Sequence, residues 1–199
     1  MLTKEQFLDK VKKYNPNLDE NLIGQAYDFS KKYHEGQYRK SSEPFFVHPI
    51  SVAISLINFG LDQNTIISAL LHDVVEDTDA TIEEVQKLFG NEVALLVDGV
   101  TKLNLINLRS TTEKSSENFR KLVMSMSKDI RVLIIKLADR LDNMRTLQFV
   151  SVEKQEKKSR ETLLIYAPLA ERIGMRQIKN ELEDLAFKYL HSKERKEIV

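Results

Sequence analysis

The chain has 199 residues, of which 42% are hydrophobic, so it can form one domain with a substantial core. Its 30 basic residues balance its 30 acidic residues, so no overall charge would attract nucleic acid or a membrane surface. The absence of cysteine excludes disulfides and thiolate metal sites, and any metal must be held by histidine and carboxylate side chains. No signal peptide or membrane-spanning run is present, so we expect a cytoplasmic location.

Apolar residues recur at helical spacing along the chain, and no strand-length run alternates between apolar and polar residues. This pattern predicts an all-α protein, a bundle of about ten helices. The predicted helices cover residues 4–13, 18–35, 48–59, 62–75, 82–89, 92–105, 116–125, 129–147, 151–173 and 175–190. The polar segment 107–115 is expected to be a loop, which either closes over a substrate or is an ordinary exposed connection.

Local signals support several of these boundaries. Asp62 is a suitable N-cap, and Thr81 with Glu84 has the spacing of a capping box. Gly90 is placed to end the helix that Thr81 begins. His34 is expected at a helix C-terminus, where the helix dipole favours it.

The first candidate site segment is HEGQYRKSSEPFFVHPI, which ends in His48, Pro49 and Ile50. Proline is tolerated at the first position of a helix, so His48 is expected at a helix N-terminus, from where it could point toward a ligand. Arg39 and Lys40 lie a few residues earlier, on the loop that enters this position. They are either solvated loop cations or contacts for a phosphate or a base.

The most informative segment is LLHDVVEDT, which places His72, Asp73, Glu76 and Asp77 at the end of an apolar helix. Helical spacing puts His72 with Glu76, and Asp73 with Asp77, on shared faces. Three carboxylates this close repel one another unless a cation or several donors lie among them. A divalent metal beside His72 and Asp73 would explain the cluster and leave Glu76 and Asp77 for proton transfer. The alternative is a solvated acidic helix end.

A third segment, KLADRLDNMRTL, lies in a strongly apolar predicted helix. Asp139, Asn143 and Thr146 form a polar stripe along that helix. A buried carboxylate is costly unless it is paired or bound to metal, so Asp139 is a candidate ligand. A salt bridge to Lys136, Arg140 or Arg145 is the alternative. Together, His48, His72, Asp73 and Asp139 would form a mixed nitrogen and oxygen ligand set.

These strings, together with ETLLIYAPLAERIGM, closely resemble the hydrolase (HD) domain of RelA/SpoT homologues, which degrade the alarmone (p)ppGpp. The resemblance extends over nearly the whole chain. It implies an HD-type helical fold and hydrolysis of the 3′-pyrophosphate, which gives GDP or GTP and pyrophosphate. It also implies a manganese ion held by His48, His72, Asp73 and Asp139. One departure is Ser42, which stands where many family members have glycine.

The resemblance assigns roles to further residues. Glu76 and Asp77 match the pair that activates the attacking water. Arg39, Lys40, Ser41, Asn143 and Thr146 match positions that line the nucleotide site. Apart from the resemblance, the positive charges of Arg39 and Arg140 are expected to neutralise substrate charge. Two carboxylate ligands make the site harder than an all-histidine zinc site, which favours manganese weakly.

Two other functions remain open at this point. The first is a binding or regulatory module that retains the HD fold without turnover. The second is a phosphohydrolase for another nucleotide, such as NADPH. We expect residues 1–199 to form a single HD-type domain without a synthetase domain, acting on a small molecule, with no nucleic-acid or membrane partner. The sequence does not fix an oligomeric state.

Overall fold

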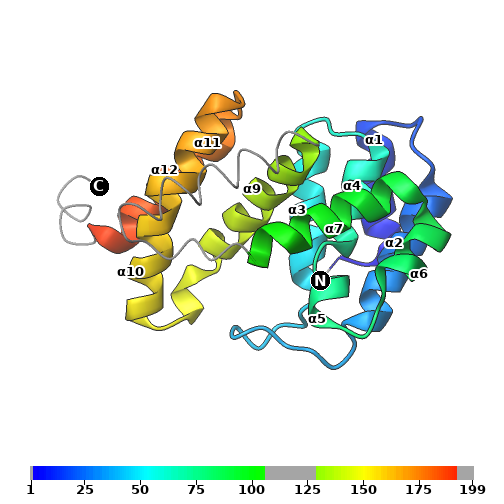
Figure 1. Ribbon diagram of the computed structural model, residues 1–199, viewed down its shortest axis with the longest axis horizontal. Helices are drawn as coiled ribbons and strands as arrows, with labels where there is room; N and C mark the ends of the chain where they lie inside the picture. Colours follow the sequence, from blue (N-terminus) through cyan, green and yellow to red (C-terminus); the bar gives the residue numbers. More distant parts are fainter. Residues whose placement is uncertain (1, 106–128, 192–199) are drawn as a thin grey trace. The chain divides into compact units, whose positions relative to one another are not determined.

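The computed structural model describes residues 2–105 and 129–191, and its regular elements over these ranges are all helical (Figure 1). The extended structure within these ranges is an isolated antiparallel bridge between Tyr38 and Pro44. The all-α prediction is therefore confirmed. The predicted helix 116–125 and the predicted loop 107–115 lie outside the described residues. The structure divides into two compact units, Met1–Lys136 and Leu137–Val199.

The described helices of the first unit correspond closely to the predicted ones. They are α1 (Lys4–Tyr14), α2 (Glu20–Tyr33), α3 (Val47–Asn58), α4 (Gln63–Leu71), α5 (Val74–Asp77), α6 (Ile82–Phe89) and α7 (Asn91–Leu105). Helix α9 (Ile130–Arg145) begins in the first unit and continues into the second. The second unit then contains η1 (Leu147–Phe149), α10 (Val152–Glu161), η2 (Thr162–Tyr166), α11 (Ala167–Arg172) and α12 (Arg176–Leu190).

Side-chain caps fix where several helices begin. The Asp62 carboxylate accepts a hydrogen bond from the Thr65 amide at the start of α4. Thr81 and Glu84 form the expected capping box at the start of α6, and Gly90 follows its end with a φ of 90°. These bonds satisfy amide groups that have no partner within the helix.

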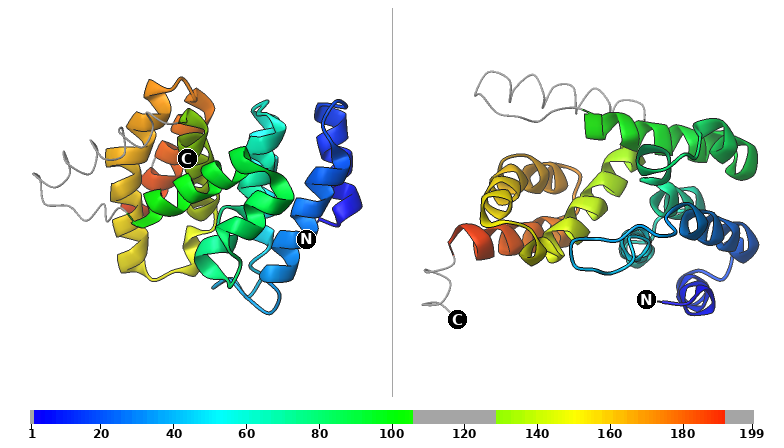
Figure 2. Two further views of the ribbon diagram at one scale, coloured as in Figure 1. Left: turned by 45° about the vertical axis from the view of Figure 1, so that its right-hand side comes forward. Right: turned by 90° about the horizontal axis from the view of Figure 1, so that it is seen from below.

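Helix α4 forms the centre of the first unit. It packs against α2, α3 and α7, and Figure 2 shows these helices around it. Every residue from Thr65 to Leu71 is buried, so α4 contributes apolar contacts on all sides rather than along one stripe. Helix α3 is also largely buried. Side chains at the ends of these two helices are therefore held on a rigid apolar base.

The predicted helix 62–75 is interrupted in the structure. Helix α4 ends at Leu71 and the single turn α5 begins at Val74. Asp73 has φ −99° and ψ −8°, which departs from regular helical geometry and redirects the chain. Apolar periodicity did not reveal this break, because Leu71 before the break and Val74 after it are both buried.

The predicted helix 151–173 is also irregular, since its middle, η2, is a π-helical turn. Pro168 lies at the start of the α11 segment that follows. Proline lacks an amide hydrogen and its ring crowds the carbonyl four residues earlier, here that of Leu164. Leu164 lies within η2, so the wider π turn accommodates this proline. In the second unit, α10, η2 and α11 all pack against α12.

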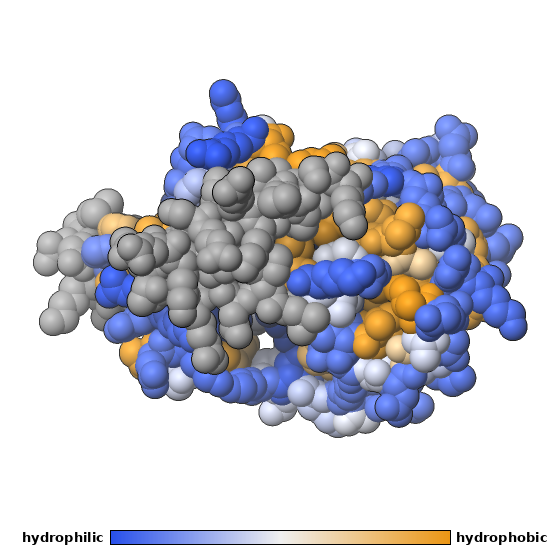
Figure 3. Space-filling model, in the orientation of Figure 1, coloured by the Kyte–Doolittle hydropathy of each residue, from blue (hydrophilic) through white to orange (hydrophobic). Residues whose placement is uncertain are grey.

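None of the described helices is both long and apolar enough to cross a membrane. Figure 3 shows one face of the molecule, on which hydrophilic residues surround several groups of hydrophobic residues. The exposed large hydrophobic residues, such as Leu88 and Leu95, come from several different helices.

Candidate metal and catalytic site

His48 lies in the first turn of α3 and is only 3% exposed. The helix begins at Val47, so Pro49 is its third residue rather than its first, as the sequence had predicted. The difference is small in physical terms because the amides of the whole first turn lack partners within the helix. Proline therefore costs no hydrogen bond at either position, and His48 is held at the helix N-terminus as expected.

His48, His72 and Asp73 meet where α3 begins and α4 ends. The Nε2 atom of His48 lies 3.5 Å from Oδ2 of Asp73, and the Nε2 atom of His72 lies 3.2 Å from Oδ1. The centroids of the two imidazole rings are 5.2 Å apart. Both rings thus direct the same nitrogen toward one carboxylate.

A hydrogen bond to the backbone fixes the protonation of His72. Its Nδ1 atom lies 2.8 Å from the carbonyl oxygen of Ala69, one turn earlier in α4. The carbonyl can only accept, so Nδ1 carries the hydrogen and the lone pair of the neutral ring is on Nε2. This is the arrangement of a metal-binding histidine whose second nitrogen is oriented by a backbone carbonyl. The donor set of two buried imidazoles and a carboxylate therefore fits a divalent metal.

The two candidate catalytic carboxylates lie on the short turn α5. Glu76 and Asp77 are exposed, and the Asp77 amide donates to the Asp73 carbonyl oxygen at 2.9 Å. The pKa of Asp77 is raised by partial loss of hydration, and then by the carboxylates of Asp73 and Glu76. The repulsion that the sequence predicted among these carboxylates is thus present in the structure.

Arg39, Lys40 and Ser41 lie at the tip of a tight turn between α2 and α3. The Arg39 amide donates to the Glu43 carbonyl at 2.8 Å, and the Ser42 amide donates to the Arg39 carbonyl at 2.9 Å. The Ser41 hydroxyl donates to the Glu43 carboxylate at 3.0 Å. The turn therefore holds its own shape.

Ser42 has φ 67°, and it is the one non-glycine residue with a positive φ among those that the structure describes. Residues with a side chain rarely adopt this left-handed conformation, whereas glycine adopts it readily. This explains in physical terms why glycine is favoured at the position where the sequence departed from the family pattern.

Asp139, Asn143 and Thr146 lie in the second unit on α9 and just after it. Asn143 donates its side-chain amide to the Asp139 carboxylate, and the Thr146 hydroxyl donates to the Asp142 carbonyl at 3.1 Å. Asp139 is buried, as are His48 and His72 in the first unit. Asp139 and Asn143 therefore share one face of α9, while Thr146 lies just beyond the end of this helix. The place of Asp139 in a ligand set with His48 and His72 stays a prediction.

Arg140 is buried in the second unit, where its contacts are with Glu161 and Tyr166. Its Nη2 atom lies 3.0 Å from the Glu161 carboxylate, and its guanidinium lies 4.0 Å from the centroid of the Tyr166 ring. These contacts give Arg140 a structural task that the sequence did not suggest. Its predicted role in neutralising substrate charge stays a prediction.

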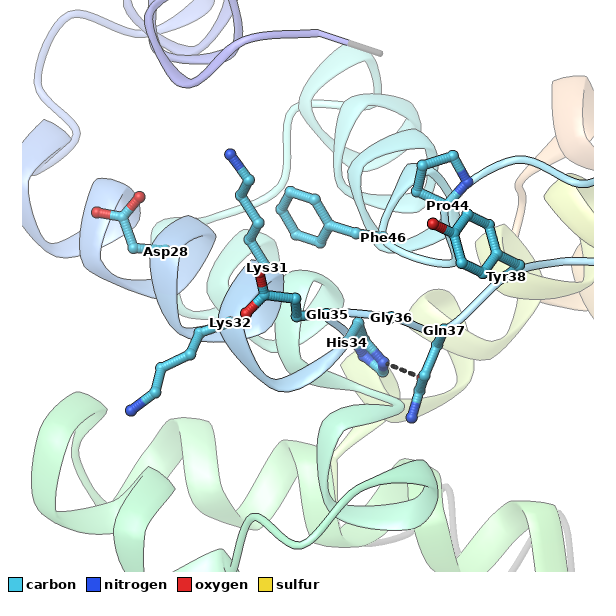
Figure 4. Close-up of a pocket in the computed structure, with 10 residues that line it drawn as sticks. All are labelled: Asp28, Lys31, Lys32, His34, Glu35, Gly36, Gln37, Tyr38, Pro44 and Phe46. Atoms are coloured by element: carbon cyan, nitrogen blue, oxygen red, sulfur yellow. Dashed lines mark hydrogen bonds between the residues drawn. The ribbon is translucent and has the colours of Figure 1, made fainter.

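Sequence patterns assigned no functional role to His34 or Gln37, which lie close together near the turn. His34 is 2% exposed and follows the last residue of α2. Figure 4 shows its hydrogen bond to Gln37 beside a cavity of about 370 Å³. Aromatic and aliphatic groups of Tyr38, Pro44 and Phe46 line part of this cavity. The predicted position of His34 at a helix C-terminus did not indicate that its side chain would be buried.

Comparison with known proteins agrees with this geometry. Residues 26–176 match the family model described as an HD domain. A protein of Myxococcus xanthus named GTP pyrophosphokinase is 53% identical, over 92% of this chain and 25% of its own length. A protein of Aquifex aeolicus named guanosine-3′,5′-bis(diphosphate) 3′-pyrophosphohydrolase is 49% identical, over 96% of this chain and 27% of its own length. The chain thus spans about a quarter of these relatives.

A solved structure is also similar. It is described as a metazoan ortholog of SpoT that hydrolyses ppGpp, and it aligns with a TM-score of 0.61 and 29% identity. The alignment covers 84% of this chain and 94% of that one.

The chain belongs to the HD-domain family. Within that family it is an HD domain of the RelA/SpoT type, as its motifs indicated.

The strained backbone at Ser42 generates a prediction about stability. Ser42→Gly should raise the free energy of unfolding by about 0.5–1 kcal/mol, because the relief of left-handed strain exceeds the added flexibility of the unfolded chain. Ser41→Gly, the same change one position earlier, should lower it, since it removes the bond to Glu43. Urea unfolding of both variants measures the difference. Equal destabilisation by the two changes would contradict the strain at Ser42.

Proposed function

We propose that this domain hydrolyses (p)ppGpp at the 3′ position and releases pyrophosphate with GDP or GTP. The observation that carries the proposal is the convergence of two buried imidazoles, those of His48 and His72, on the Asp73 carboxylate. The names of the Aquifex relative and of the solved metazoan structure support the same substrate. Guanine nucleotides are cytoplasmic metabolites, which agrees with a cytoplasmic enzyme acting on a small molecule.

The metal ligands in this proposal are His48, His72, Asp73 and Asp139, and the metal is manganese. HD-family membership and the buried histidines support a divalent metal, and the two carboxylates favour manganese over zinc. When bound, such an ion lowers the pKa of water and stabilises charge that develops on phosphoryl oxygens. The hydrogen bond from Asn143 to Asp139 would hold that carboxylate in one orientation.

The protein supplies the proton transfer and the substrate contacts. Glu76, alone or with Asp77, orients the attacking water and accepts its proton, because both carboxylates lie one turn beyond Asp73. Arg39 on the turn neutralises phosphate charge, and Lys40 and Ser41 pack or hydrogen-bond at the base. We assign further substrate contacts to Arg140, Asn143 and Thr146, and we propose that residues 1–199 act as a single HD-type domain.

Two other functions are tested by the same experiments. A regulatory module that binds nucleotide without turnover would bind manganese and ppGpp but release no product. A phosphohydrolase for NADPH would release phosphate from NADPH under conditions in which ppGpp is stable. The solved relative that hydrolyses ppGpp favours the alarmone over both.

The metal assignment predicts the effect of removing His72. His72→Ala should lose bound manganese and hydrolysis, because the imidazole that faces Asp73 is removed. His191→Ala, a histidine change outside the proposed site, should keep both. Metal content is measured by elemental analysis after dialysis, with thermal unfolding to confirm that each variant is folded. Manganese at the wild-type level in folded His72→Ala would contradict the assignment.

The role of Glu76 predicts a different pattern of losses. Glu76→Gln keeps the size of the side chain and removes the base, so the turnover rate should fall by about 10²–10⁴ while manganese content stays unchanged. Glu83→Gln, an exposed change on α6, is the matched control and should leave the rate unaffected. Loss of manganese from Glu76→Gln would instead make Glu76 a metal ligand.

The substrate assignment predicts a preference that product analysis can measure. With manganese, the wild type should convert ppGpp to GDP and pyrophosphate and leave GTP and NADPH largely intact. Arg39→Ala should weaken this reaction, and salt should weaken it in the wild type, since exposed contacts to phosphate are screened. Lys10→Ala on α1 is the control for loss of a positive charge. Comparable turnover of all three nucleotides would indicate a promiscuous phosphatase, and turnover of NADPH alone would indicate the other enzyme class.

A further inference from the structure

The side chain of Gln37 connects the end of α2 to the end of α5 within the first unit. Its Oε1 atom lies 2.8 Å from Nδ1 of His34, and its Nε2 atom donates to the carbonyl oxygen of Asp77 at 3.0 Å. Figure 4 shows the first of these contacts. One amide thus links a buried histidine to the main chain of a candidate catalytic residue.

The chemistry of these partners leaves one orientation for the amide. The Asp77 carbonyl oxygen can only accept a hydrogen bond, so the group that faces it must be the NH₂ of Gln37. The oxygen of the amide then faces His34, and an oxygen can only accept. The Nδ1 atom of His34 must therefore carry the hydrogen.

The surroundings of His34 keep its ring neutral. Burial lowers its pKa, although the hydrogen bond that His34 donates to Gln37 and the nearby Asp73 carboxylate act in the opposite direction. The neutral ring is the Nδ1–H tautomer, and its Nε2 lone pair has no hydrogen-bond partner among the described residues. The ring packs against Phe45, with centroids 4.8 Å apart, and Phe45 packs against His48 at 6.0 Å. His34 is therefore part of the wall that supports a proposed metal ligand.

The turn α5 needs support from outside itself. It has four residues, which is too short to be stable without tertiary contacts. Its own bonds include the one from the Asp77 amide to Asp73 and the one from the Thr78 hydroxyl to the Val74 carbonyl at 2.6 Å. Gln37 donates its hydrogen bond to the carbonyl of Asp77 itself. This bond therefore helps to fix the main chain from which the Asp77 side chain extends.

We propose that Gln37 is a positioning residue for the hydrolysis, because it aligns Asp77 through the main chain and holds His34 in the Nδ1–H tautomer. This inference rests on the proposed function. Gln37 does not touch the reacting atoms. It acts through Asp77 and through the packing of His34 on Phe45 behind His48.

The first test uses Gln37→Met, which keeps the length of the side chain and removes both hydrogen bonds. The kcat for ppGpp should fall by about 10- to 100-fold, the scale of a small misplacement of catalytic groups, with KM and manganese content unchanged. Gln155→Met is the matched control, since Gln155 also donates its amide to a backbone carbonyl, that of Val150 at 2.8 Å. It should leave kcat unchanged. Loss of manganese, or a change confined to KM, in Gln37→Met would overturn the proposal.

The second test asks whether Gln37 acts through the Asp77 carboxylate. Asp77→Asn removes the carboxylate and keeps the main-chain carbonyl that Gln37 contacts. If Gln37 serves to align that carboxylate, Gln37→Met should lower kcat little further in the Asp77→Asn background. If Gln37→Met lowers kcat by the same factor in the Asp77→Asn variant as in the wild type, Gln37 does not act through the Asp77 carboxylate and the proposal is overturned.

The third test does not depend on activity. Nitrogen-15 NMR of the metal-free protein should show His34 as the Nδ1–H tautomer, and Gln37→Met should change its tautomer populations. An Nε2–H tautomer of His34 in the wild type would overturn the Gln37 contact whether or not the protein is active. Absence of ppGpp hydrolysis in the wild type, by contrast, would overturn the proposed function and with it the kinetic role of Gln37.

Discussion

The site of the first unit depends on the break in the helix at His72 and Asp73. A continuous helix would direct consecutive side chains about 100° apart, so neighbouring residues could not face the same point. In the structure α4 stops at Leu71, and the chain turns at Asp73 before α5 begins. The two side chains can then approach each other, and His48 reaches the same carboxylate from the start of α3. The buried core around α4 holds this break in place.

Repulsion among the carboxylates of the acidic turn destabilises the fold, and the proposed chemistry requires these carboxylates. Asp73, Glu76 and Asp77 lie within one helical turn, and their repulsion contributes to the raised pKa of Asp77. A protein selected for stability alone would replace at least one of them with a neutral residue. A bound cation would offset the repulsion, which ties occupancy of the metal site to the stability of α5. The same charges that destabilise the turn thereby make it selective for cations.

Much of this could be read from the sequence, and the exceptions have physical causes. The helices, the caps at Asp62 and Thr81, and the place of Asp139 and Asn143 on one helix face follow from periodicity and side-chain chemistry. The break at Asp73 could not be read from periodicity, because His72 and Val74 on either side of it are both buried. The π turn of η2 arises beside Pro168, and apolar periodicity does not report the number of residues in one turn. Local sequence patterns do not report tertiary packing. The burial of His34, its contact with Gln37 and the pairing of Arg140 with Glu161 all arise from such packing.

The π turn of η2 lets this helix contain one additional residue without losing the register of its two ends. A π turn contains one residue more than an α turn, so the segment Thr162–Tyr166 is equivalent to an α-helix that has gained an insertion. Winding the same residues as a regular α-helix would instead rotate everything beyond them, because each α-helical residue turns the chain by about 100°. Tyr166 would then leave the Arg140 guanidinium that it covers. The π turn therefore absorbs one additional residue and keeps Tyr166 in register with Arg140.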